Sequence, residues 1–482
     1  MIVIDVILME KSKLFKNTIF YSIGEILPRA IAFLMLPIYT RYLSPEDYGI
    51  NSYTHTIIMF LFVLGTFALN TYVLRYYFIH EEAEERRTLL GTIHLTIIGL
   101  NVLILGLAFL LMPPIIDFYK IQVPWNPYFR LAFIINFFEC FSIIPLVLYR
   151  VRQDAIKFVA LGLTRTVLTV LLTLFFVVYQ KRGLLGSFEA QIYVLVPYSI
   201  VYFAVMQRYA RWHIRWEYLK EGLRFSSPLL PGVICYQMLS VSDRIILERN
   251  VGIGELGIYN VACQMAFVLN IIIQSGYRAI EPELFRRYGK DDFYDFMRKT
   301  QSFFFFVIYV SAFALCLYSQ EVFFVMTTEA FHGGYLLVPA LIIGVIMVGQ
   351  NVIYGGVLQG EKRTKIIGAA TVVGAVISVV INLLLIPLWG TYAAATASAV
   401  SFFVMNTILF CSMTYPGKTM YRETILVCLI PGISYPLFLL LGDVCLVGVI
   451  LKFVAVCIYL LIAKILMHVN VLQLRLFFVK RN

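Results

Sequence analysis

Apolar runs of about 20 residues recur along the whole chain, and this pattern constrains the fold more than any other feature. A run of that length can cross the hydrocarbon core of a bilayer as an α-helix. The composition agrees, because 60% of the 482 residues are hydrophobic and 14% are charged, whereas soluble domains carry about 25% charged residues. The sequence therefore predicts an all-α polytopic membrane protein.

The runs divide into about 14 predicted transmembrane helices. They span about residues 17–39, 50–72, 88–111, 128–148, 158–179, 191–209, 226–247, 258–283, 300–326, 336–358, 366–388, 391–412, 423–441 and 444–467. We expect two pseudo-symmetric six-helix lobes plus two C-terminal helices. The expected parts are an N-terminal lobe 1–209, a basic cytoplasmic linker 210–225, a C-terminal lobe 226–412, and helices 13 and 14 with a cytoplasmic tail, 413–482.

The chain has a net charge of +11, and its basic residues are spread unevenly between the two sides of the membrane. Lysine and arginine gather in the connectors on the same side as the N-terminus, such as Arg86–Arg87 and Arg286–Arg287. The positive-inside rule then places both termini in the cytoplasm. The basicity therefore reflects membrane topology and does not indicate a nucleic-acid partner. The connectors are also too short to hold a soluble ATPase or glycosyltransferase domain.

Two similar strings lie half a chain apart. "YTRYLSPEDYGI" (39–50) and "ERNVGIGELGIY" (248–259) align with an offset of 208 residues, which pairs Gly49 with Gly257. We interpret both as the outer turn between the first and second helices of a lobe. The string "GIGELG" within the second matches G-x-G-x-x-G formally, but no strand precedes it, so we expect a turn and not a dinucleotide site. Parallel repeats are typical of two-lobed transporters with a central site.

Several further strings accompany the repeat. They are "RYY" (75–77), "FSSPLLP" (225–231), Asp243-Arg244, "GELGIYNVA" (254–262), "GEKRTK" (360–365) and "NLLLIPLWGTYAAATAS" (382–398). With "YTRYLSPEDYG", their order and spacing resemble the Wzx-type polysaccharide flippases, which belong to the superfamily that also holds the MurJ lipid II flippases and the MATE exporters. The resemblance covers most of residues 17–412.

The resemblance implies a flippase of the bacterial cytoplasmic membrane. Its substrate would be an undecaprenyl-pyrophosphate-linked oligosaccharide repeat unit, moved outward by alternating access for surface polysaccharide biosynthesis. The resemblance implies transport without ATP hydrolysis and without a bound cofactor. A proton or sodium gradient is the candidate driving force. Polysaccharide polymerase machinery is the candidate protein partner, and the last two helices are candidates to shape a groove for the isoprenoid tail.

Charged and amide side chains within the spans are the candidate substrate-binding residues. An ionised side chain at mid-membrane costs about 2.5–3.5 kcal/mol, so it faces a partner or a wet cavity. The candidates are Glu25 and Arg29 on the first helix, Arg75 on the second, Arg165 on the fifth, and Gln274 and Arg278 on the eighth. Arginine suits a diphosphate because its planar guanidinium donates two parallel hydrogen bonds and stays charged.

The alternative is that these charges are structural. The pairs would then be Glu25 with Arg29, Arg165 with Glu139, and Arg278 with Glu281, while Arg75 would extend to the lipid headgroups.

Asp243 and Asn382 are the candidate ion-coupling residues. A carboxylate within a span can bind a proton or a cation and couple its gradient to movement, and related flippases hold the cation site in the second lobe. The alternative for Asp243 is a structural pair with Arg244. We predict no metal site, because the eight cysteines lack metal-ligand spacing.

Two rival functions stay open. A MATE-like exporter of small organic cations is the nearer one, although several arginines in a cavity would repel such substrates. A membrane-embedded polysaccharide polymerase or ligase is the other, and it typically carries a large outer loop that this chain lacks.

Overall fold

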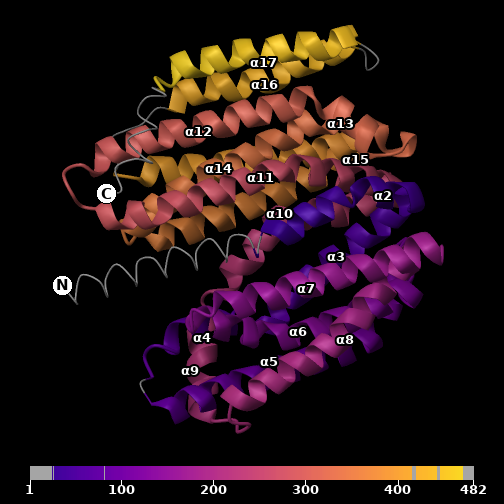
Figure 1. The fold of residues 1–482 in the computed structure, drawn as a ribbon, viewed down its shortest axis with the longest axis vertical. Coiled ribbons are helices and arrows are strands. Elements are labelled where there is room, and N and C mark those ends of the chain that lie inside the picture. The colour runs from indigo at the N-terminus through magenta and orange to yellow at the C-terminus, as the bar shows by residue number, and fades with distance from the viewer. Residues whose placement is uncertain (1–23, 25, 81, 415–419, 442–445, 470–482) are drawn as a thin grey trace. The chain divides into compact units, whose positions relative to one another are not determined.

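The computed structural model describes residues 24, 26–80, 82–414, 420–441 and 446–469, and these residues form helices joined by short turns, without a β-strand (Figure 1). The predicted all-α class is therefore confirmed. The described residues form two compact units, which are considered separately below. Unit 1 comprises residues 1–237 and 252–257, and unit 2 comprises 238–251 and 258–482. Helices α10 and α11 pass from one unit to the other.

Unit 1 contains the helices up to α9 and the first residues of α10 and α11. Their bounds are α2 Leu36–Tyr42, α3 Pro45–Thr66, α4 Leu69–Tyr76, α5 Ala83–Tyr119, η1 Trp125–Phe129, α6 Arg130–Val151, α7 Ala155–Thr173, η2 Leu174–Tyr179, α8 Gly183–Tyr209 and α9 Trp216–Ser226.

Unit 2 holds the remaining helices. Their bounds are α10 Leu230–Val251, α11 Ile253–Arg287, α12 Phe293–Leu317, α13 Ser319–Met326, η3 Glu329–Leu337, α14 Val338–Gly360, α15 Thr364–Ser412, α16 Met420–Leu441 and α17 Leu446–Leu466.

The predicted spans from the second onward each fall on one of these helices or on two consecutive ones. The first lies partly outside the described residues, although 26–34 are helical. Within the described part of the chain, nine helices are long and apolar enough to cross a membrane, or ten if the bent pair α3–α4 counts as one span. Helix α15 holds two predicted spans, because the backbone of Gly390 (φ 58°, ψ −132°) departs from helical geometry between them. The chain is therefore a multi-pass membrane protein.

The second predicted span is broken, which the sequence did not indicate. Phe67 (φ 48°) and Ala68 (φ 54°) both adopt left-handed conformations, and α3 and α4 meet at 45°. Such a conformation costs about 1–2 kcal/mol for a residue other than glycine. The side chain of Asn101 on α5 stabilises the break, since its Nδ2 donates to the carbonyl of Gly65 at 3.2 Å. Asn136 on α6 in turn donates to Asn101 Oδ1 at 3.3 Å.

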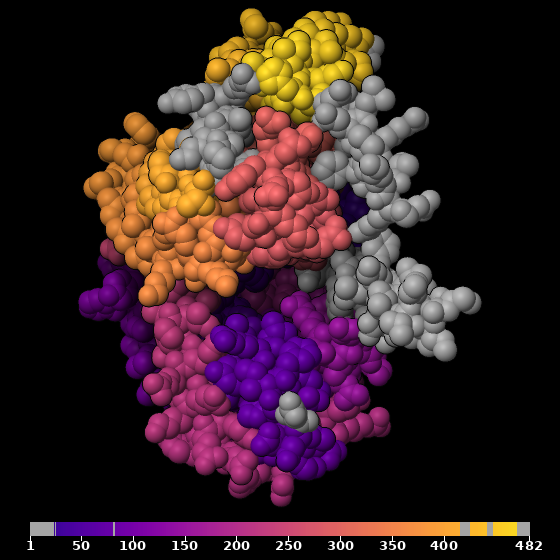
Figure 2. Space-filling view, turned by 90° about the vertical axis from the view of Figure 1, so that its left-hand side faces the viewer, coloured from indigo at the N-terminus to yellow at the C-terminus, as the bar shows by residue number. Residues whose placement is uncertain are grey.

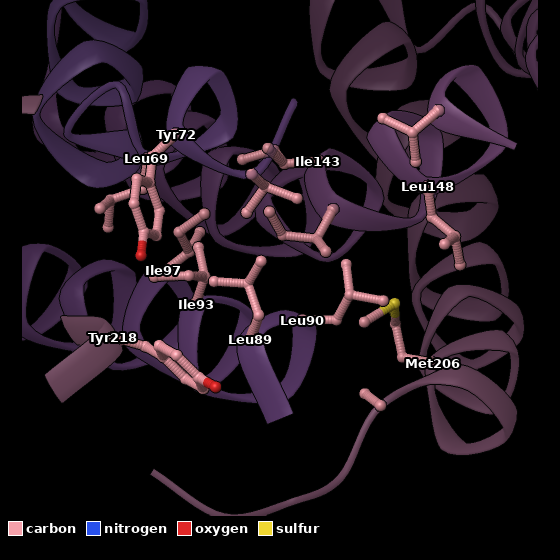
Figure 3. Close-up of a cluster of buried hydrophobic side chains, with 14 of the residues drawn as sticks. Leu69, Tyr72, Leu89, Leu90, Ile93, Ile97, Ile143, Leu148, Met206 and Tyr218 are labelled. Atoms are coloured by element: carbon pink, nitrogen blue, oxygen red, sulfur yellow. The ribbon is translucent and has the colours of Figure 1, made fainter. Parts of the chain in front are cut away.

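The core of unit 1 lies between α4, α5, α6, α8 and α9 (Figure 3). Leu69, Tyr72, Ile93 and Met206 have no measurable exposure there. Burying a side chain of this size contributes about 1.5–3 kcal/mol in water, but lipid chains are as apolar as leucine, so packing contacts carry more of the stability here.

Unit 2 includes the C-terminal helix pair α16–α17, which packs on α12 and α14. Phe313 and Tyr459 stack with ring centroids 4.1 Å apart. The buried Lys452 of α17 (1% exposed) forms an ion pair with Glu321 of α13, with Nζ 2.6 Å from Oε1. A buried charge left without its partner would be costly, so this pair fixes where α17 attaches.

Within unit 1, residues 45–49 of the first string pack against residues 253–257 of the second. Helices α3 and α11 begin at aligned positions, Pro45 and Ile253, and Ser44 caps the first with its hydroxyl and Asp47 in a capping box. A Cβ on Gly49 would lie 1.8 Å from the carbonyl oxygen of Ile253, and a Cβ on Gly257 would lie 1.8 Å from that of Pro45. In both contacts a backbone carbonyl occupies the place of a side chain, so only glycine fits at positions 49 and 257. We call this close approach of the two helix starts the glycine crossing.

We predict that Gly49→Ala and Gly257→Ala each destabilise the purified protein by about 1–3 kcal/mol, the usual cost of overpacking. The added methyl group must push the two helix starts apart. Thermal unfolding in detergent, followed by light scattering, measures the effect. Gly99→Ala is the matched control, because a Cβ at this helical glycine meets nothing within 4 Å. Equal melting temperatures for all three variants would contradict a required crossing.

Candidate functional site

Arg165 and Glu139 form the strongest polar contact in the membrane-spanning part of unit 1. The guanidinium of Arg165 on α7 donates two parallel hydrogen bonds to the carboxylate of Glu139 on α6, Nη1 to Oε1 at 2.8 Å and Nη2 to Oε2 at 2.6 Å. Their side chains are 27% and 29% exposed. The pair that the sequence analysis named as the structural alternative is therefore present. Its partial exposure leaves the guanidinium accessible from one side.

Hydroxyl groups line α7 near this pair. Thr169 and Thr173 follow Arg165 at intervals of four residues, and their hydroxyls donate to the carbonyls of Arg165 at 2.9 Å and Thr169 at 2.7 Å. Tyr198 on α8 donates to Thr164 Oγ1 at 2.7 Å. Thr173 is buried, whereas Thr164, Thr169 and Tyr198 are at least partly exposed, so their oxygen lone pairs can accept hydrogen bonds from sugar hydroxyls.

The other candidates of unit 1 stand apart from this pair. Arg29 is exposed in the helical segment 26–34, whereas Glu25 lies outside the described residues. Arg75 is exposed at the end of α4, with its guanidinium carbon 5.6 Å from the ring centre of Phe225.

The candidates of α11 lie on one face of unit 2. Gln274 Nε2 donates to Asn270 Oδ1 at 3.3 Å, one helical turn apart. Arg278 follows one further turn along the helix and is half-buried. The predicted polar stripe thus combines amides with a guanidinium, which suits a ligand that presents both hydroxyls and negative charge.

Asp243 is buried and fully engaged. Its Oδ1 accepts from the backbone N–H of Arg244 at 2.9 Å and from Nη1 of Arg244 at 3.1 Å. Its Oδ2 accepts from the hydroxyl of Tyr259 on α11 at 2.5 Å. The Arg244 pair was the structural alternative. Tyr259 was not among the predicted residues, because a tyrosine 16 positions away gives no sequence signal.

Asn382 is completely buried on α15. Its Nδ2 lies 3.4 Å from Ser378 Oγ, one turn earlier, and its Oδ1 has no hydrogen-bond partner among the described residues. Helices α15 and α10 meet nearby, since a Cβ on Gly374 would lie 3.7 Å from Leu239 Cδ2. Asp243 follows Leu239 by one turn, and Ser378 follows Gly374 by one turn.

Two protein-family profiles match this chain. The profile described as polysaccharide biosynthesis protein matches residues 14–286. The chain belongs to this family. The MatE profile matches residues 228–384 of this chain. The resemblance predicted from the sequence is thereby confirmed.

Individual relatives agree with the family assignment. A protein of the Lsg locus of Haemophilus influenzae is 23% identical over 277 residues, which make up 56% of this chain and 65% of that protein. The alignment thus spans slightly less than two thirds of the relative.

Solved structures show the same fold. A lipid II flippase MurJ in an inward closed conformation has a TM-score of 0.70 at 13% identity, over 95% of this chain and 99% of that one. An inward-facing multidrug resistance MATE transporter has a TM-score of 0.65 at 13% identity, over 83% and 98% of the two chains. This polysaccharide biosynthesis protein therefore has the MurJ and MATE transporter fold.

We predict that Arg165 and Glu139 are energetically coupled. Arg165→Ala and Glu139→Ala each leave a partly buried charge unpaired, so the double variant should lose less stability than the sum of the two, by on the order of 1 kcal/mol. Thermal or denaturant unfolding of the four proteins measures this. Arg165→Lys should recover little, because an ammonium group cannot donate the parallel pair of hydrogen bonds. Strict additivity would show that the pair contributes nothing.

Proposed function

We propose that this protein is a flippase that carries an undecaprenyl-pyrophosphate-linked oligosaccharide repeat unit across the bacterial cytoplasmic membrane for surface polysaccharide biosynthesis. It works by alternating access between the predicted lobes 1–209 and 226–412, with both termini in the cytoplasm. Polysaccharide polymerase machinery receives the product on the outer side.

One observation carries the proposal. The same chain matches the polysaccharide biosynthesis profile over residues 14–286 and has the fold of a lipid II flippase over 95% of its length. The family membership supports a role in polysaccharide biosynthesis, and the fold supports movement of a bulky lipid-linked molecule.

The arginines supply the chemistry that the proposal needs. A diphosphate carries negative charge that is costly to bring into a low-dielectric region unless fixed cations meet it. Arg29, Arg165 and Arg278 are at least partly exposed within predicted spans, and guanidinium groups bind phosphate oxygens in pairs. Gln274 and the threonine hydroxyls of α7 would contact the sugars.

A MATE-like small-cation exporter is the second candidate, and the MatE match over 228–384 favours it. The two functions differ in the charge of the cargo. Substrate-facing arginines attract a diphosphate and repel an organic cation. A drug-efflux phenotype with normal surface glycan would select the exporter.

We predict that Arg29→Ala and Arg278→Ala each reduce glycan export by about tenfold or more, since a charge-assisted hydrogen bond contributes about 1.5–3 kcal/mol. Export is measured as surface polymer in a strain that lacks the chromosomal gene, and as accumulation of lipid-linked repeat units. Membrane insertion is checked by immunoblotting of washed membranes.

Arg298→Ala is the matched control for this prediction, because Arg298 is 63% exposed and pairs with Asp295 one turn away. Its export should equal that of the wild type. Unchanged export by the Arg29 and Arg278 variants would remove their proposed contact with the diphosphate.

We further propose that Asp243 and Asn382 couple a proton or sodium gradient to the cycle. Their support is the approach of α10 and α15 and the unpartnered Oδ1 of the buried Asn382. The opposing observation is that Arg244 and Tyr259 already engage the carboxylate. A cation would have to displace one of them.

We predict that Asp243→Asn abolishes the dependence of flipping on the ion gradient, while Tyr259→Phe keeps it. Asp243→Asn removes the charge of the carboxylate, whereas Tyr259→Phe keeps the charge and removes only the hydrogen bond from the tyrosine hydroxyl, so Tyr259→Phe controls for loss of stability. Flipping of a fluorescent lipid-linked oligosaccharide in proteoliposomes, with imposed sodium or proton gradients, measures this. If both variants lose stability alike and keep the gradient response, Asp243 is structural.

A further inference from the structure

The segment between α8 and α9 is not a free connector but is fixed along α5 of unit 1. The backbone N–H of Arg211 donates to the carbonyl of Arg87 at 2.9 Å. The carbonyl of Arg211 lies so close to Gly91 that a Cβ there would be 1.8 Å from its oxygen. A side chain at position 91 would therefore push the segment off the helix.

Thr92 fastens the next residues of the segment. Its buried hydroxyl donates to the carbonyl of His213 at 3.1 Å and accepts from the backbone N–H of Arg215 at 3.1 Å. One side chain thus satisfies two backbone groups of a segment that has no helical hydrogen bonds of its own.

Helix α9 continues this attachment through its inner face. Tyr218 is 6% exposed and lies beside the core cluster (Figure 3). A Cβ on Gly222 would lie 3.1 Å from the ring of Tyr72, and the hydroxyl of Tyr72 donates to Glu221 at 3.0 Å. Because the inner face is fixed in this way, the same residues of the segment always face outward from unit 1.

The outer face combines positive charge with exposed aromatic and aliphatic surface. Residues 208–226 contain five Lys or Arg against two Glu, and all five basic residues are exposed. They are Arg208, Arg211, Arg215, Lys220 and Arg224. Trp216 is 68% exposed, Ile214 52% and Trp212 36%. Figure 2 faces the side of the molecule on which α4 and α9 are labelled in Figure 1, and part of the rose-coloured surface of unit 1 is visible there.

The acidic neighbours do not neutralise this face. Arg211 approaches Glu84, and Arg215 approaches Glu217, each at 3.7 Å, near the outer limit for an ion pair. The side chains of these pairs are 51% to 80% exposed, so their contacts are weak. Lys220 and Arg224 have no ion pair among the described residues.

We propose that this linker surface, residues 208–226, binds the headgroups of anionic phospholipids and so ties unit 1 to the inner leaflet. Basic residues interspersed with exposed tryptophan and isoleucine are the side chains that bind a negatively charged bilayer surface. Tryptophan lies at the level of the headgroups because its ring is amphipathic. The inference does not depend on which substrate the protein moves.

The test uses the full-length protein in nanodiscs of phosphatidylcholine with or without phosphatidylglycerol. Brominated acyl chains quench nearby tryptophan fluorescence, and the difference between wild type and Trp216→Phe isolates Trp216. We expect brominated phosphatidylglycerol to quench Trp216 at least about twofold more than brominated phosphatidylcholine at equal bulk fraction. Added salt should remove that preference by screening.

The variant Arg211→Gln/Arg215→Gln/Lys220→Gln/Arg224→Gln should lose the preference for phosphatidylglycerol while keeping its melting temperature. The matched control removes four exposed basic residues from the turn between α11 and α12 and the helix ends beside it, Arg286→Gln/Lys290→Gln/Arg298→Gln/Lys299→Gln, and should retain the preference.

Three results would overturn the proposal. Equal quenching of Trp216 by both lipids would show that the linker surface contacts the bilayer without preferring anionic headgroups. Absence of quenching would place the surface in water or against a soluble partner. Retention of the preference in the linker variant would assign the lipid selectivity to other residues.

Discussion

Inside a bilayer no water is available to a backbone N–H or C=O group, and this constraint decides the secondary structure of the chain. Long apolar sequences must fold as helices, which satisfy these groups within one segment. Where a helix is interrupted, another group must take the place of water. At the break between α3 and α4, Asn101 does so by donating to the carbonyl of Gly65. The polar residues Asn101 and Asn136 are thus a requirement of the break and need not contact a ligand.

The same lack of water governs the charges. Three ionic side chains within the helices are held by named partners: Lys452 by Glu321 of α13, Asp243 by Arg244 of its own helix and Tyr259 of α11, and Arg165 by Glu139 of α6. Such pairs stabilise a membrane protein only while they remain intact, because one unpaired member would be left in a low-dielectric surrounding. Arg29, by contrast, is exposed.

The all-α class and the positions of the apolar helices could be predicted because length and hydropathy report directly on the bilayer, whereas the predicted number of 14 spans stays a prediction beside the nine or ten found among the described residues. The break at Phe67–Ala68 could not be predicted, since neither residue is glycine or proline and the left-handed geometry depends on support from α5. Nor could the partners of the charges be chosen with certainty. Glu139 lies 26 residues from Arg165 and was named as one alternative, whereas the contact of Tyr259 with Asp243 and that of Glu321 with Lys452 arise only from tertiary packing.

The contact of Gly49 with Ile253 has a counterpart in the contact of Gly257 with Pro45, and each aligned pair is separated by 208 residues. A contact that maps onto itself when its two members are exchanged is what a two-fold axis produces between identical subunits. The two glycine contacts are therefore equivalent, and a side chain added at either glycine would open the same crossing from one of its two sides.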